Sequence, residues 1–440
     1  MQGILPWRRE EAGQFGGLLA ASSMRAPMHL LQILLAVPSF LFLATLAAML
    51  FRHPDVPSFE FDRLAFVLLV LSLVARVLIL RRSEFAFRRA TWPMAGLVVL
   101  ATASVIGQPF NPETWSMLAS KFLVPFTLFH VAGSVLDDQR SFRRFEIFCV
   151  AVLAYLSFTA IASLVGARAL IFPRYILDES IGFHADRARG PFLQAVANGV
   201  SINLLALIAL HAYRRGSVRG VKVAIVLAMV PIAILATMTR AVWLAFAGTV
   251  AAVVLLAPTR RAKRVGAGVL SVCAVAMLLV FSTDSGGAFN DRLAERGPVD
   301  YREAVYAGGW EMSWQHPLLG WGFHQMPAEL PRHVCGYKEK VLYPHNTYLE
   351  MLVEQGLLGL GFYAWLMCEL WKLRRPGQGD SGQHGFPGDE FRRVWPMMLG
   401  VYWVNAATVV MSYQFVNALL FTMAGFLASQ RRRAERVTAC

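Results

Sequence analysis

Charged side chains are scarce in this chain. Asp, Glu, Lys and Arg together make up 16% of its 440 residues, whereas hydrophobic residues make up 56%. A soluble protein of this length needs more charge to cover its surface, so the shortage excludes an ordinary soluble globular protein. A mean hydropathy of +0.49 indicates instead a chain that lies mostly in a membrane.

Cysteine is also scarce, and internal repetition is missing. Five cysteines are scattered along the chain, and of these only Cys335 falls in the long polar stretch between Ser282 and Pro344. A single cysteine cannot form a disulfide within that stretch, so no disulfide framework is predicted. The two halves show no repeat, which argues against the duplicated architecture of many transporters.

Apolar runs, in contrast, are abundant. They predict an all-α polytopic membrane protein with about twelve transmembrane helices. The predicted organisation has three parts: residues 1–281 with nine spans and short loops, residues 282–345 as one large, partly helical loop, and residues 346–440 with three spans and the C-terminus. The predicted spans lie near 30–51, 64–80, 91–107, 115–135, 145–165, 191–212, 221–237, 241–257, 265–281, 346–371, 394–410 and 413–430.

Basic residues orient these spans. Most of the 42 lysines and arginines lie in alternate short loops and near both ends of the chain. By the positive-inside rule these loops and both termini face the cytoplasm, and the loops at 52–63, 108–114, 166–190, 238–240 and 282–345 face outward. The net charge of +14 is therefore a topology signal, and nucleic acid is not an expected partner.

A few basic residues break this pattern because they lie in outward loops. Arg187 and Arg189 come just before the sixth span, and Arg240 lies in a turn so short that its guanidinium must stay at the membrane face. A guanidinium can hold two phosphate oxygens at once, which suits a lipid-linked diphosphate. The same side chain can instead snorkel or pair with a carboxylate. That structural alternative is favoured for Arg174, Arg292 and Arg332.

The large loop ends in Pro344-His345-Asn346-Thr347-Tyr348-Leu349-Glu350, immediately before an apolar span. His345 therefore lies at the start of a membrane helix, where the helix dipole and the free N–H groups favour an anion and keep an imidazole neutral. A neutral imidazole with a pKa near ~6.5 can accept a proton from an alcohol. The structural alternative, a histidine that only makes hydrogen bonds at the helix start, stays open.

The large loop is predicted to be partly helical. Asp300-Tyr301-Arg302-Glu303 has the form of a capping box, and His316-Pro317 ends the helix that follows. Aromatic residues are frequent in this loop, and they can stack on sugar rings or anchor the loop among lipid headgroups. They are Tyr301, Tyr306, Trp310, Trp314, Trp321, Phe323, Tyr337 and Tyr343.

Several of these segments resemble the O-antigen ligase and O-antigen polymerase superfamily. Pro317-Leu318-Leu319-Gly320-Trp321-Gly322 is similar to one of its recurring patterns, and so is Pro344 to Glu350 followed by Glu354-Gln355-Gly356-Leu357-Leu358-Gly359. Thr239-Arg240 and Arg187-Ala188-Arg189-Gly190 stand where that superfamily has its two arginine steps. The resemblance covers roughly residues 230–370.

The resemblance implies a class C glycosyltransferase-like helical enzyme in a bacterial inner membrane. Such an enzyme transfers a glycan from undecaprenyl diphosphate to an acceptor hydroxyl at the periplasmic face, with no metal and no other cofactor. His345 would be the base, and Arg189 and Arg240 the diphosphate clamps. The expected partners are the undecaprenyl diphosphate-linked glycan, the lipid A-core acceptor and membrane lipids. Further candidate substrate-binding residues are Arg187, Arg302, Trp310, Asn346 and Tyr348.

Three alternatives stay open. A polymerase of the same superfamily transfers the glycan to another lipid-linked repeat, whereas a ligase, which the resemblance and the single compact loop favour, transfers it to lipid A-core. Glu60-Phe61-Asp62 is an acidic step that can hold a hard cation, as a metal-dependent glycosyltransferase requires. A carrier or flippase for a lipid-linked glycan is disfavoured by the missing repeat and by the few ionisable residues inside the spans.

Overall fold

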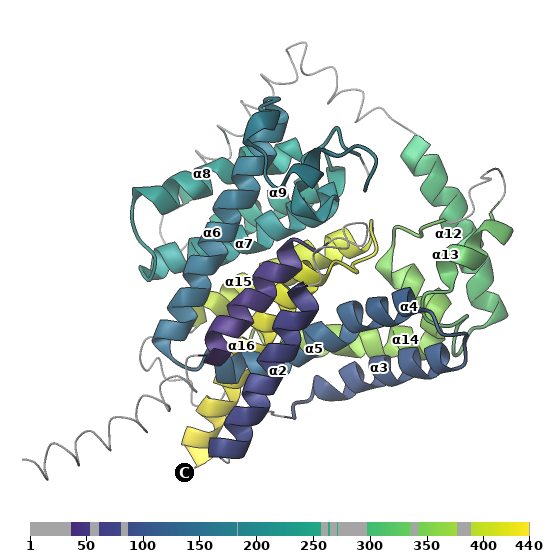
Figure 1. Cartoon of the computed structure of the whole chain (residues 1–440), viewed down its shortest axis with the longest axis horizontal. Helices are drawn as coiled ribbons and strands as arrows, with labels where there is room; N and C mark the ends of the chain where they lie inside the picture. The colour runs from purple at the N-terminus through teal and green to yellow at the C-terminus, as the bar shows by residue number, and fades with distance from the viewer. Residues whose placement is uncertain are drawn as a thin grey trace, which may run out of the picture.

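The computed structural model describes residues 37–52, 61–80, 87–182, 184–256, 263–264, 271, 297–334, 336, 342–375 and 389–439. The regular elements in these ranges are all helices (Figure 1). The expectation of an all-α protein is therefore confirmed for the part of the chain that the structure describes.

The described helices lie where the hydropathy pattern predicts spans. The span expected at 265–281 falls almost entirely outside the described residues. The others correspond to Val37–Leu50, α2 (Phe61–Leu80), α3 (Thr91–Ile106), α4 (Pro112–Leu118) continued by α5 (Val124–Val135), α6 (Gln139–Leu164), α7 (Ala195–Arg215), α8 (Val221–Ala236), α9 (Arg240–Leu255), α14 (Thr347–Lys372), α15 (Asp389–Ala406) and α16 (Gln414–Ala439).

Four of the described segments are long and apolar enough to cross a membrane: Pro112–Val135, Gln139–Leu164, Ala195–Arg215 and Thr347–Lys372. Four shorter apolar helices accompany them: Val37–Leu50, Thr91–Ile106, Val221–Ala236 and Arg240–Leu255. Large apolar side chains are exposed along the helices, for example Leu71 and Leu78 on α2, as lipid-facing surfaces require. The chain is thus a membrane protein built of apolar helices, and its total of twelve spans stays a prediction.

The helices pack as two groups joined by a central set (Figure 1). α6, α7 and α8 contact one another, and α9 contacts α7 and α8. α3 packs against both α4 and α14, which run toward α12 and α13. α5 packs along α16, and α15 contacts α7, α9 and α14, which joins the groups. One continuous apolar core extends through these helices, from Phe42 to Ala428.

The helix from Pro112 to Val135 contains a local irregularity. Pro125 has no N–H to donate to the carbonyl of Lys121, four residues earlier. A π-helical turn, Ala119–Leu123, precedes the proline, and the N–H of Val124 donates five residues back to the carbonyl of Ala119. The wider turn takes up the defect in the hydrogen-bond ladder and places Lys121 inside the bundle.

The described part of the large loop forms α12 (Gly297–Gln315) and α13 (Met326–Glu329). Because α12 begins at Gly297, Asp300 lies within its first turn, and the predicted capping box at Asp300 was wrong. A carboxylate in the first turn still complements the positive end of the helix dipole. This segment has a small apolar core of its own, packed on Val353 of α14 and formed by Val305, Met312, Met326, Leu330, Val334 and Leu342.

Candidate functional site

The start of α14 is formed by the segment that the sequence analysis singled out. Asn346 is the N-cap residue, and its side-chain oxygen accepts from the N–H groups of Tyr348 at 2.9 Å and Leu349 at 3.2 Å. An N-cap of this kind stabilises a helix by about 0.5–2 kcal/mol. The amide oxygen of Asn346, a predicted substrate-binding residue, therefore serves helix α14 in this structure.

Two further side chains fix this helix end to α15 and to the connection that follows it. The Thr347 hydroxyl donates to the carbonyl of Val409 and accepts from the N–H of Met411, both at 2.9 Å. The Tyr348 hydroxyl donates to the carbonyl of Trp403 at 3.1 Å. Tyr348, also a predicted substrate-binding residue, thus directs its hydroxyl toward α15.

His345 lies in the turn just before α14 and is half-buried. Its φ is +46°, a conformation that non-glycine residues rarely adopt and that concentrates at functional sites. Its ring meets the ring of Tyr301 edge-on, with centroids 5.7 Å apart, and the Tyr306 hydroxyl donates to the His345 carbonyl at 3.3 Å. These contacts hold His345 between α12 and α14.

The surroundings of His345 set its charge. Burial lowers the pKa of the imidazole to about 4, and the positive charges of Arg302 and His184 act in the same direction. The ring is therefore neutral at pH 7, as a general base must be. The same interaction places Arg302, on α12, and His184, in the loop between α6 and α7, within electrostatic reach of His345.

The predicted arginines meet at a second place. The N–H of Ala188 donates to the carbonyl of Ala236, the last residue of α8, at 3.1 Å. This bond brings the segment with Arg187 and Arg189 beside the short turn that leads to Arg240, the first residue of α9. The two arginine steps, distant in sequence, are therefore neighbours in the fold.

The loop between α6 and α7 connects the two places. The N–H of Arg187 donates to the carbonyl of His184 at 3.1 Å, which closes a tight turn. The loop therefore reaches from the surroundings of His345 to the α8–α9 turn. Gly190 lets it approach α7, because its φ is +56° and a Cβ there would lie 2.7 Å from the side-chain oxygen of Asn198.

Arg189 is buried, with 1% of its surface exposed. Its guanidinium donates to three backbone carbonyls of its own loop: from Nε to Ile176 at 3.0 Å, from Nη1 to Ile181 at 2.7 Å and from Nη2 to Asp178. Most of the N–H groups of this guanidinium therefore bind the loop itself. Arg240, in contrast, is half-buried at the start of α9.

Two of the arginines for which a structural role was favoured contact groups of their own segments. Arg174 donates to the carbonyls of Arg168 at 2.9 Å and Ala169 at 3.2 Å, and Arg332 pairs with Glu329. The third, Arg292, lies outside the described residues.

The predicted substrate-binding residues of α12 differ in exposure and in neighbours. Arg302 is half-buried near His345. Trp310 is 55% exposed and meets Trp314 edge-on, with ring centroids 5.8 Å apart. Arg302 therefore adds charge to the His345 site, whereas Trp310 offers an open aromatic surface.

The turn Pro317–Gly322 supplies backbone partners where α14 is broken. Gly356 interrupts the helix with a φ of +65°. The N–H of Trp321 donates to the carbonyl of Val353, and the N–H of Leu357 donates to the carbonyl of Pro317, both at 2.8 Å. These bonds satisfy groups that a continuous helix would pair internally.

The glycines of both sequence patterns allow this close approach. A Cβ on Gly320 would lie 2.5 Å from the backbone of Glu354, and a Cβ on Gly356 would lie 2.3 Å from the backbone of Leu318. Both glycines also have a positive φ. The two patterns are thus the two sides of one backbone contact, which fixes the end of α12 to α14.

An ion pair inside the bundle was missed by the sequence analysis. Nζ of Lys121 lies 2.5 Å from Oε2 of Glu350, and both residues are buried. The ammonium also lies over the rings of Phe122 and Phe323, 5.7 and 5.6 Å from their centroids. Glu350 follows His345 by five positions, so the pair anchors the helix end that carries the predicted base.

The signal for this pair was a lysine inside an otherwise apolar span, since ionisable residues at such positions are costly and mark functional sites. Glu354, one turn after Glu350, is 1% exposed, so α14 buries a second carboxylate. The expectation of few ionisable residues inside the spans overlooked both carboxylates.

The acidic step of the first outward loop is only partly described. Glu60 lies outside the described residues, and Asp62 is buried with an oxygen 3.3 Å from Nη1 of Arg52. Among the residues that the structure describes, no three His, Cys, Asp or Glu side chains gather as metal ligands do. The Asp62 carboxylate thus forms an ion pair that links α2 to the residues just after the helix Val37–Leu50.

A family model described as O-antigen ligase matches residues 223–364 of this chain. The match includes most of α8, all of α9, the described part of the large loop and more than half of α14, and it contains Arg240, Arg302 and His345. The recognition of the O-antigen ligase superfamily from sequence patterns is therefore confirmed for this region. A search of curated proteins gave no match.

Proposed function

We propose that this protein is a glycosyltransferase that moves an O-antigen polysaccharide from undecaprenyl diphosphate to a hydroxyl of lipid A-core at the periplasmic face of the inner membrane. The observation that carries the proposal is a neutral imidazole at a helix start, inside the matched O-antigen ligase region. It lies within reach of the loop between α6 and α7, which carries Arg187 and contacts the turn before Arg240. An anion-binding helix start and cationic side chains suit a diphosphate leaving group.

In the proposed mechanism His345 takes the proton of the acceptor hydroxyl. The acceptor oxygen forms a bond to the anomeric carbon, and the bond from that carbon to the diphosphate oxygen breaks. The diphosphate leaves with the electron pair, and Arg240 and Arg187 stabilise the charge that develops on it. A diphosphate is a good leaving group, so this charge stabilisation matters more than protonation by an acid.

Arg302 has a separate part in this mechanism. Its positive charge keeps His345 neutral before the reaction, because it opposes a second cation nearby. The same repulsion favours release of the proton after transfer. The three carbonyls bound by Arg189 make it a positioning residue for the loop that carries Arg187.

The proposal is tested by deleting the gene and complementing the strain. A ligase deletion leaves lipid A-core without O-antigen while polymer accumulates on the undecaprenyl carrier. A polymerase deletion leaves single repeat units on lipid A-core, and a flippase deletion leaves no polymer outside. Either of the last two patterns contradicts the proposed transfer to lipid A-core.

The Lys121–Glu350 pair is expected to position the start of α14. Lys121→Met or Glu350→Gln should slow transfer by about 10²-fold, since a displacement of ~1 Å at a reacting group has an effect of that size. The combined exchange of Lys121→Glu with Glu350→Lys should recover part of the rate. Transfer per folded protein is the quantity to measure.

A second buried ion pair provides the matched control. Nη2 of Arg215 lies 2.8 Å from Oε2 of Glu146, between the end of α7 and α6. Arg215→Met should lower the thermal stability as Lys121→Met does, yet leave the rate per folded molecule within about twofold, because changes at distant sites without shared partners act independently. Equal rate losses in both variants mean that the Lys121–Glu350 pair acts through stability alone.

A further inference from the structure

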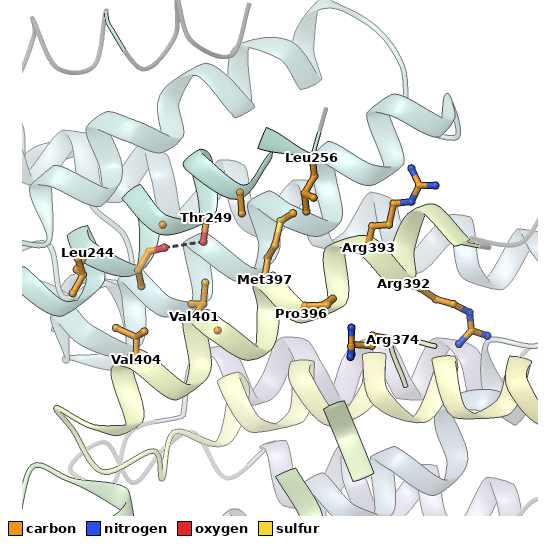
Figure 2. Close-up of a pocket in the computed structure, with 14 residues that line it drawn as sticks. Leu244, Thr249, Leu256, Arg374, Arg392, Arg393, Pro396, Met397, Val401 and Val404 are labelled. Atoms are coloured by element: carbon orange, nitrogen blue, oxygen red, sulfur yellow. Dashed lines mark hydrogen bonds between the residues drawn. The ribbon is translucent and has the colours of Figure 1, made fainter. Parts of the chain in front are cut away.

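A groove runs between α9 and α15, away from the site described above (Figure 2). Its volume is about 740 Å³, and most of its lining is apolar. Leu244 and Val404 lie at one end, and Leu256 lies toward Arg393 at the other. The one hydroxyl in the lining, that of Thr249, donates to the carbonyl of Ala245 at 2.8 Å, so it adds little polarity.

The length of the groove corresponds to one leaflet of a bilayer. Twelve residues separate Leu244 from Leu256 on α9, and at 1.5 Å per residue they extend over about 18 Å. One leaflet contributes about 15 Å to the hydrocarbon core. An occupant with its polar group at one end and its apolar part along the groove would lie within a single leaflet.

Three arginines mark the polar end of the groove (Figure 2). Arg392 is buried, and its Nη1 donates to the carbonyls of Leu373 and Arg375, so it closes the end of α14. Arg374 is exposed and stacks over Trp371, 4.6 Å from the ring centroid, and Arg393 is exposed. Two accessible guanidinium groups at the mouth of an apolar groove complement a phosphate that carries apolar chains.

Glycines on both helices border the open space of the groove. A Cβ added to Gly248 on α9 or to Gly400 on α15 would meet no atom within 4 Å. Glycine inside a helix is unfavourable by about 1 kcal/mol relative to alanine. Both positions have room for a larger side chain, so the groove can be filled by substitution.

We propose that the groove between α9 and α15 binds an anionic phospholipid of the cytoplasmic leaflet. The acyl chains lie between Leu244 and Leu256, and the phosphate lies between Arg374 and Arg393. The site goes beyond the proposed transfer and does not depend on it, because it contains neither His345 nor the loop between α6 and α7.

The position of the charge selects this lipid over the glycan donor. Arg240, at the proposed catalytic face, begins α9, whereas Arg374 and Arg393 lie where α9 ends. In the sequence, basic residues flank the connection between α14 and α15 on both sides, and the positive-inside rule assigns this connection to the cytoplasm. A donor whose diphosphate lies at the opposite face would leave these arginines without an anion.

The test uses the purified full-length protein in detergent, titrated with phosphatidylglycerol and followed by native mass spectrometry and thermal unfolding. Gly248→Leu with Gly400→Leu adds side chains at two positions where a Cβ meets no atom within 4 Å, and it should weaken phosphatidylglycerol binding by at least tenfold. Gly361→Leu is the matched control, since Gly361 is an equally open helical glycine on α14 outside the groove. It should bind as the wild type does.

The charge is tested separately. Arg374→Gln with Arg393→Gln should weaken binding by about 10–100-fold, since a hydrogen bond to a charged group contributes that much affinity. Arg214→Gln, an exposed arginine in the last turn of α7, should have no effect. Undecaprenyl phosphate and phosphatidylcholine serve as competitors. The proposal is overturned if the variant Gly248→Leu with Gly400→Leu still binds phosphatidylglycerol as the wild type does. It is also overturned if undecaprenyl phosphate binds more tightly than phosphatidylglycerol.

Discussion

Replacing His345 with alanine is expected to slow glycan transfer by roughly 10²–10⁴-fold, the usual contribution of a positioned general base. Binding of the lipid diphosphate should change much less, because cationic side chains rather than the neutral imidazole hold that charge. The effect should appear in kcat with little change in KM for the donor. An equal loss in donor binding would assign His345 to the structural alternative at the helix start.

The pH dependence of the wild-type enzyme has a definite sign. His345 acts as a base only when neutral, and its pKa is about 4 rather than 6.5. The rate should therefore stay level from pH 7 to about 5, where such a group is still mostly neutral, and fall toward pH 4. A midpoint near the ordinary value of 6.5 would contradict the burial of this ring in the working enzyme.

The same group affects stability. In the unfolded chain the imidazole titrates near its ordinary pKa of 6.5, and in the folded chain near 4. Between these values the unfolded state binds more protons, so stability falls as the pH falls through this window. His345→Gln should lose this part of the pH dependence, which thermal unfolding at pH 7 and pH 4.5 can measure.

Excess EDTA distinguishes a metal-independent reaction with His345 as the base from a reaction that depends on a cation bound by Glu60 and Asp62 of the first outward loop. The proposed mechanism needs no divalent ion, so transfer by the purified enzyme should survive EDTA. If EDTA abolishes turnover and a divalent ion restores it, Glu60 and Asp62 take the central role, and His345 becomes a helix-start residue. Glu60→Gln is the cleaner variant, because Asp62 is buried beside Arg52 and its loss would also disturb packing.

Arg240→Ala is expected to slow transfer by roughly 10²–10³-fold, the loss typical of removing one group that stabilises developing charge. The fold should not suffer, because a cation at the first position of a helix is unfavourable toward the helix dipole. Arg240→Lys should recover little of the rate, since an ammonium lacks the fork that holds two oxygens. Full activity of Arg240→Lys would remove this residue from the clamp.

Arg189→Ala provides an instructive comparison with Arg240→Ala. It leaves three carbonyls without their donor, and for the buried one, that of Ile176, the loss costs about 1–3 kcal/mol. We therefore expect Arg189→Ala to lose both activity and thermal stability, whereas Arg240→Ala loses activity alone. Rates and unfolding temperatures of the two variants, measured in the same detergent, distinguish a residue that organises the loop from one that contacts the substrate.

The residues of the candidate site were proposed from sequence because they stand next to strong local signals. His345 precedes an apolar run, and Arg240 interrupts two of them, so both were found without any knowledge of packing. Lys121 and Glu350 could not be paired in this way, since 229 positions separate them. Asn346 and Tyr348 were predicted to bind substrate. In the structure the side-chain oxygen of Asn346 caps the N-terminus of α14, and the Tyr348 hydroxyl donates to the carbonyl of Trp403.

The sequence by itself determined the membrane class, the ends of most helices and the family of residues 223–364. Hydropathy and short motifs depend only on residues that are close together in the chain, so they can be recognised without the fold. Only the tertiary structure decided which way the side chains point. Arg189 binds its own loop, Gly320 packs on the backbone of Glu354 where α14 is broken, and Gly248 and Gly400 line one groove. Each of these contacts depends on how one helix is rotated against another, and that rotation is set by packing between segments far apart in the chain.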